Sequence, residues 1–156
     1  MIADYASEDR SELLGAPRQY GITQNHKHLK EMKAITGIEY EPIFCPIVSD
    51  FYSGMTVTVP VFASDINEGY TVQDIKDIYE KKYNTPIVMC MGADEDSFVS
   101  AAGMSGKDSM GICVFGNEDR ILLVARYDNL GKGASGAAVE VLNMLLGNDK
   151  TKGLNV

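Results

Sequence analysis

The chain has 156 residues, 45% of them hydrophobic and 23% charged, which is the size and composition of one globular domain with a buried core. Its formal net charge is −8, and it lacks the clustered Lys and Arg side chains with which proteins neutralise nucleic-acid phosphates. It also lacks the run of about 18 apolar residues that a membrane helix needs and the pattern of a signal peptide, so we expect a cytoplasmic protein with neither a nucleic-acid nor a membrane partner.

Residues 1–20 mix charge with small residues without periodicity and predict an extended lead-in. Asn25 is the expected N-cap of a helix over residues 26–35, which Gly37 ends. The β-rich stretch 38–54 contains two prolines, which favour an irregular or edge strand, and its last five residues are typical of a turn.

The clearest strand is predicted over residues 55–63, MTVTVPVFA, where β-branched side chains alternate. Thr71 begins a helix that runs to about residue 83, with Asp74 in the position of a capping box. A short strand, IVMCM, is then expected over residues 87–91.

Residues 92–109 predict a polar loop with a short extended piece at 98–102. Two strands follow, joined by the turn residues 116–119 as a hairpin. The last predicted element is a helix over residues 131–147, small at its start, apolar later, and ended by a glycine.

This element order predicts an α+β domain, a mixed and largely antiparallel sheet covered by helices on one face. The second, apolar face would then need a cover. A second copy of the chain commonly supplies one, so we expect a homodimer through the sheet.

The three cysteines are odd in number and contain no CxxC pair, which argues against a disulfide framework and a zinc site. Cys90 and Cys113 lie in apolar stretches typical of buried strands. Cys45 has no neighbouring base or positive charge in the sequence, and a thiolate nucleophile needs such an environment.

His26 and His28, the only histidines, stand two apart at a predicted helix start. No third ligand accompanies them, so we expect no metal. Two interpretations stay open: a general acid or base, since histidine titrates near neutral pH, or a polar pair that starts the helix.

Asn129 and Lys132 lie between the hairpin and the glycine-rich segment GKGASG, residues 131–136. A helix N-terminus there favours anions. A dinucleotide fingerprint would follow the first strand of a βαβ unit rather than a hairpin, so a close-packed helix start is the alternative.

Three segments, YGITQNHKHLKEM, PIVSDFYSGMTVTVPV and YDNLGKGASGAAVEVLNMLLGNDKTKGL, together resemble the second half of N-acetyl-gamma-glutamyl-phosphate reductases. The resemblance runs from about Asp4 to Leu154. That family is related to aspartate-semialdehyde and glyceraldehyde-3-phosphate dehydrogenases, so the resemblance implies a fold like the C-terminal domain of the latter enzyme.

In that family a cysteine thiolate attacks an acyl phosphate, NADPH reduces the thioester to an aldehyde, and a histidine acts as acid or base. The resemblance implies that His28 is this residue, with His26 in support, and that Tyr20 and Lys132 contact substrate. It also implies that Asn129 and Gly133 lie near the NADP cofactor.

The family's nucleophilic Asn-x-Gly-Cys element and its glycine-rich dinucleotide fingerprint do not occur in this sequence. We therefore expect the substrate-binding and dimerising half of the reductase, inactive alone, with Met1 an internal methionine or the start of a fragment. Residues 1–20 would be the remnant of the junction, 21–130 the substrate-binding and dimerisation domain, and 131–156 a helix and tail that pack on the missing half.

Two alternatives stay open. One is a free-standing ligand-binding or interaction domain derived from the reductase. The other is a complete small enzyme that uses Cys45 with His28.

Overall fold

The structure, a computed structural model, describes residues 2–156. Met1, and with it the prediction that this residue is an internal methionine or the start of a fragment, lies outside the described residues. The chain divides into two compact units, one ending at Phe51 and one running from Tyr52 to Val156. We call them the N-terminal unit and the sheet unit and describe each by itself. No helix within residues 2–156 is long and apolar enough to cross a membrane.

The N-terminal unit contains two short helices, a 3-10 turn and a two-stranded antiparallel ribbon: α1 (Ile2–Tyr5), the turn Glu12–Gly15, β1 (Arg18–Gln19), α2 (Lys27–Thr36) and β2 (Ile47–Val48). Helix α2 confirms the expected helix and ends at Gly37, whose φ of 73° is left-handed. The expected N-cap, Asn25, is wrong. His26 caps α2 instead, because its imidazole Nδ1 accepts a hydrogen bond from the His28 N–H at 3.3 Å.

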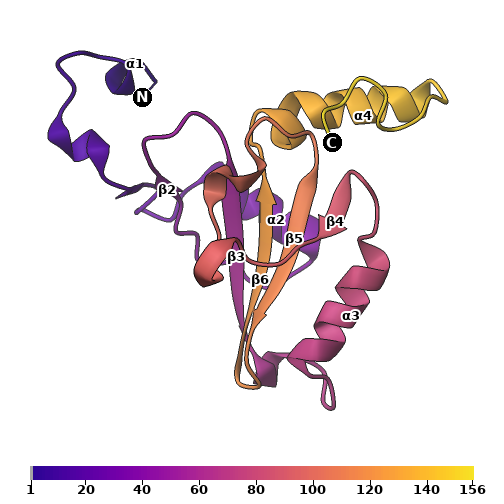
Figure 1. Cartoon of the computed structure of the whole chain (residues 1–156). Helices are drawn as coiled ribbons and strands as arrows, with labels where there is room; N and C mark the ends of the chain where they lie inside the picture. Colours follow the sequence, from indigo (N-terminus) through magenta and orange to yellow (C-terminus); the bar gives the residue numbers. More distant parts are fainter. Residues whose placement is uncertain (1) are drawn as a thin grey trace. The chain divides into compact units, whose positions relative to one another are not determined.

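The sheet unit contains four strands and two α-helices: β3 (Met55–Phe62), α3 (Val72–Lys82), β4 (Val88–Cys90), β5 (Met110–Gly116), β6 (Arg120–Tyr127) and α4 (Gly136–Leu145). The strand order is β3-β6-β5-β4. β6 pairs antiparallel with both β3 and β5, whereas β4 runs parallel to β5. Figure 1 shows α3 beside β4 and α4 beyond the end of β6. The mixed, largely antiparallel sheet confirms the α+β prediction.

Local sequence explains most of these elements. Thr71 and Asp74 form the expected capping box at the start of α3. Asn117 turns the β5–β6 hairpin, since its side-chain oxygen accepts from the N–H groups of Asp119 and Arg120. The expected extended piece at 98–102 is confirmed in its first part, since Phe98 and Ser100 have extended backbone, and is wrong at Ala101 and Ala102. A 3-10 helix, Ala101–Met104, forms there with the Ser100 hydroxyl as its cap.

Helix α3 packs on the part of the sheet that β4 and β5 form. It lies on the face that carries Cys90, because this cysteine and Glu80 of α3 line one groove. The strand register places Cys90, Ile112, Ala125 and Val57 in one row across that face. The helix-covered face therefore continues over β6 to β3, where Met55, Val57 and Val59 remain exposed.

The opposite face of the sheet is covered locally by residues 91–104. Arg126, only 1% exposed, donates to Asp94 at 2.6 Å and holds this segment on the sheet. Its guanidinium holds the pKa of the Asp94 carboxyl below its usual value. The exposed apolar strip of Met55, Val57 and Val59 therefore lies on the helix-covered face of the sheet. The sequence had predicted that the uncovered apolar surface would be on the other face. The buried apolar side chains of the sheet unit are Ile87, Met104, Cys113, Val114, Ile121 and Val124.

Candidate functional site

In the N-terminal unit, both histidines gather with two aromatic side chains. The ring of His26 lies 4.5 Å from that of His28, 5.3 Å from Phe44 and 6.2 Å from Tyr20, measured between centroids. Phe44 also lies 6.3 Å from His28. Three of the predicted site residues, Tyr20, His26 and His28, therefore belong to one cluster.

The Gln24 side chain holds the main chain of Phe44. Its amide donates to the Phe44 carbonyl at 2.7 Å, and its amide oxygen accepts from the Phe44 N–H at 2.9 Å. Gln24 itself has a positive φ of 55°, in the turn that connects β1 to α2. This side chain thus fixes Phe44 against the histidines.

The two histidines differ in what their rings can do. His26 uses Nδ1 as the acceptor of the helix cap, which assigns its proton to Nε2. The His28 ring has no part in the cap. Its side chain is 48% exposed, and Nε2 lies 3.9 Å from a carboxylate oxygen of Glu31, one turn further along α2.

In the sheet unit, the Asp128 carboxylate joins three segments of the chain. One oxygen accepts from the Ser53 hydroxyl at 2.7 Å and from the Gly106 N–H at 2.5 Å. The other accepts from the N–H groups of Leu130 at 2.7 Å and Gly131 at 3.0 Å. Asp128 is 3% exposed. We call these four hydrogen bonds the Asp128 node.

Burial alone would raise the pKa of Asp128, because it disfavours the charged carboxylate. The hydrogen bonds from Gly106, Ser53, Gly131 and Leu130 act in the opposite direction and together lower this pKa to about 2. The node is therefore built around an ionised carboxylate at neutral pH.

The predicted site residues of the sheet unit follow directly after this node. Asn129 Oδ1 accepts from the Gly54 N–H at 2.8 Å, and the Asn129 side-chain nitrogen has no hydrogen-bond partner among the described residues. The Lys132 ammonium forms an ion pair with Glu140 of α4. Gly133 donates its N–H to the Asp128 carbonyl at 2.8 Å, and a Cβ at this position would lie 3.2 Å from the Tyr127 ring.

This loop continues into a π-helical turn, Gly131–Ser135, before α4 begins. A Cβ at Gly131 would come within 2.5 Å of the Lys107 carbonyl oxygen, and one at Gly136 would collide with the Asp108 carboxylate. The glycines of GKGASG therefore allow the close packing that the alternative interpretation expected.

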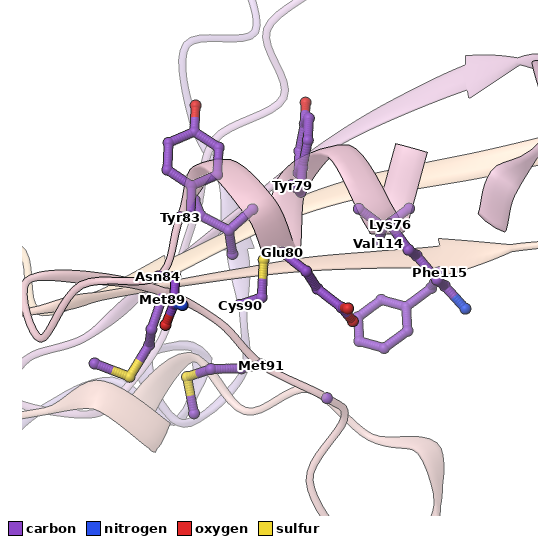
Figure 2. A pocket seen from close by; sticks show the side chains of 12 residues that line it. Lys76, Tyr79, Glu80, Tyr83, Asn84, Met89, Cys90, Met91, Val114 and Phe115 are labelled. Carbon is purple, nitrogen blue, oxygen red and sulfur yellow. The ribbon is translucent and has the colours of Figure 1, made fainter. Parts of the chain in front are cut away.

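A groove of about 570 Å³ lies between α3 and the sheet and contains none of the predicted site residues. Figure 2 shows Cys90 in this groove, on the side of α3. Burial raises the pKa of the Cys90 thiol, and the Glu80 carboxylate adds to that effect. Burial also raises the pKa of Cys113. Both environments disfavour a thiolate nucleophile.

The predicted site residues thus form two groups, the histidine cluster in the N-terminal unit and the Asn129–Gly133 loop in the sheet unit. Gln24 and Asp128 were not predicted as site residues. A signal for Asp128 exists in the sequence: an Asp in a turn after a strand, here in Asp-Asn-Leu-Gly, typically accepts from N–H groups two residues on. Nothing comparable marks Gln24. Within residues 2–156, no group of three His, Cys, Asp or Glu side chains is placed to hold a metal.

The sheet unit, with its mixed four-stranded sheet and helices, defines an α+β fold. Residues 4–129 match the family model described as semialdehyde dehydrogenase, dimerisation domain, and the chain belongs to this family. Similar proteins include the N-acetyl-gamma-glutamyl-phosphate reductases of Rhizobium meliloti, 38% identical, Allorhizobium ampelinum, 39%, and Brucella ovis, 36%.

These comparisons confirm the resemblance found in the sequence. Each alignment covers 94% of this chain but only 49% to 50% of the relative. The chain therefore spans about half the length of the curated relatives it matches.

Proposed function

We propose that this chain is the substrate-binding and dimerising half of an N-acetyl-gamma-glutamyl-phosphate reductase, an enzyme that reduces an acyl phosphate to the semialdehyde with NADPH in arginine biosynthesis. The observation that carries the proposal is similarity to such reductases along 94% of the chain. We place the protein in the cytoplasm. In this proposal residues 131–156 pack on the nucleotide-binding half. Exposed apolar side chains on α4 and at its C-cap would suit such packing: Val141, Leu142, Leu145 and Leu146.

Within this function we assign the proton transfer to His28. Its imidazole is exposed and lies outside the helix cap, whereas the Nδ1 of His26 is committed to the His28 N–H. Glu31 is close enough to favour one orientation of the His28 ring. His26, Tyr20 and Phe44 then form the wall against which the reacting group is held.

We assign the nicotinamide end of the cofactor to the Asn129–Gly133 loop. With Oδ1 bound to Gly54, the Asn129 side chain presents only its NH₂ group, a donor that fits the carbonyl oxygen of a carboxamide. When bound, NADPH would supply the hydride. Lys132 would be available to a substrate anion only by leaving Glu140.

The nucleophile and the dinucleotide-binding half must come from elsewhere, so the chain alone is expected to be inactive. The test is reverse-direction oxidation of the semialdehyde with NADP and phosphate, monitored as NADPH formation. The chain is assayed alone and mixed with a separately produced nucleotide-binding half of a relative. We expect activity only in the mixture.

Two other results would contradict this expectation. Activity of the chain alone would point to a complete small enzyme, and loss of that activity in Cys45→Ser would identify its nucleophile. A mixture that associates but stays inactive would favour the alternative of a ligand-binding or interaction domain without redox chemistry.

We propose further that the chain is a homodimer and that the strip of Met55, Val57 and Val59 lies in its interface. These side chains extend the apolar face beyond the cover of α3, and Val59 is 52% exposed. An apolar strip of this kind is stable in water when a second copy covers it.

Val59→Asp is expected to weaken the dimer by about 100-fold or more, because burying an unpaired carboxylate costs several kcal/mol. Sedimentation equilibrium measures the dissociation constant. Thr58→Asp is the matched control, since the neighbouring side chain points to the opposite face and is exposed. Equal weakening by both variants would argue against this strip as the interface.

A further inference from the structure

The last nine residues, 148–156, fold back and join two parts of the sheet unit; we call them the tail. At one end, the buried Asn143 of α4 donates from its side chain to the carbonyls of Lys150 at 3.3 Å and Lys152 at 2.8 Å. At the other end, Asn155 lies against the turn formed by residues 106–108. The tail therefore bridges α4 and this turn.

Asn155 contacts the 106–108 turn with both its main chain and its side chain. Its N–H donates to the Asp108 carboxylate at 2.9 Å, and its carbonyl accepts from the Asp108 N–H at 2.8 Å. Its side-chain amide donates to the Gly106 carbonyl at 2.7 Å. Main chain and side chain of Asn155 thus hold both ends of the 106–108 turn.

The same turn contacts the loop that follows Asp128. The Gly106 N–H is one of the four donors of the Asp128 node, and the Lys107 carbonyl accepts from the Lys132 N–H at 3.4 Å. The Lys107 carbonyl and the Asp108 carboxylate also lie where a Cβ at Gly131 or Gly136 would stand. Any displacement of the turn must therefore open space beside the loop or break the node.

These contacts close a ring: the Asn129–Gly133 loop leads into α4, α4 holds the tail, the tail holds the turn, and the turn holds the loop. We propose that Asn155 is a positioning residue, which acts through the 106–108 turn to keep the Asn129 amide in its place. The effect of Asn155 on cofactor binding rests on the proposed function. Its effect on the conformation of the Asn129–Gly133 loop does not.

The test compares the unmodified chain with Asn155→Ala by amide hydrogen exchange, followed by NMR. Exchange at Gly106, Leu130 and Gly131 is expected to become about tenfold faster, whereas the sheet amides of Val57 and Cys113 keep their rates. The Asn129 side-chain NH₂ resonances are expected to shift. A second variant that ends at Leu154 also loses the main-chain bonds of Asn155 and is expected to have a larger effect.

Thr151→Ala is the matched control, because Thr151 lies in the tail and its side chain bonds only to the neighbouring Asp149. Unchanged exchange at Leu130 and Gly131 in both Asn155 variants would overturn the inference, and so would a uniform increase that includes the sheet amides. In the reverse-direction assay of the mixture with a nucleotide-binding half, Asn155→Ala is expected to raise the KM for NADP more than it lowers kcat. If the unmodified mixture has no activity while the exchange result holds, only the proposed function fails.

Discussion

Replacement of His28 by glutamine is expected to lower kcat of the reconstituted reductase by about 10²- to 10⁴-fold, the range that general acid–base catalysis contributes. Glutamine keeps a polar side chain of similar length but cannot transfer a proton at neutral pH. The His26 cap should persist in this variant, since it uses the main-chain N–H of residue 28. The measurement is the initial rate of NADPH formation at saturating aldehyde, NADP and phosphate.

His26→Asn is the matched control. Asparagine is among the best N-cap residues, so α2 should keep its start while the imidazole is lost. We expect a decrease of less than about tenfold in kcat, far below the general-base range. If instead His26→Asn were as damaging as His28→Gln, the assignment of the proton transfer to His28 would be wrong. Circular dichroism of both variants checks that α2 and the fold are retained.

Asp128→Ala is expected to destabilise the sheet unit by about 3–5 kcal/mol, since it removes a buried carboxylate that accepts four hydrogen bonds and leaves their donors unpaired. Such a loss is a large fraction of the stability of an ordinary domain. Urea unfolding measures it, with the slope against denaturant expected to stay unchanged. Asp119→Asn in the exposed hairpin turn is the control and should change stability by less than about 0.5 kcal/mol.

The same carboxylate makes a pH-dependent contribution. Its pKa is about 2 in the folded chain, against 3.8 for an ordinary Asp. The folded state therefore binds the proton less readily than the unfolded state. The resulting stabilisation, about 2 kcal/mol, is fully present above about pH 4 and is lost as the pH falls toward 2. Asp128→Ala should remove this part of the acid sensitivity. An unchanged pH dependence in the variant would contradict the role given to the node.

Short-range patterns in the sequence were enough to predict several secondary-structure elements of this protein. The alternating side chains of β3, the capping box at Thr71 and the turn at Asn117 each act through neighbours within a few residues, and each element forms where expected. The motifs around the histidines and around GKGASG were also enough to indicate the family that the comparisons confirm. The sequence alone therefore determined the α+β class, most of the elements and the family.

Contacts between residues far apart in the sequence decided the rest. Asp128 meets Ser53 across 75 positions, and Gln24 reaches Phe44 across 20, so neither partner can be read from local spacing. Helix α2 is capped by His26 and not by Asn25, a difference of one residue that commits the Nδ1 of His26 to a hydrogen bond with the main chain. Arg126 decided which face of the sheet stays open, because its pairing with Asp94 holds residues 91–104 over the opposite face. For Asp128 and Arg126 the deciding term is burial of a charged group, which is tolerated only where the fold supplies a partner, and the fold alone brings such partners together.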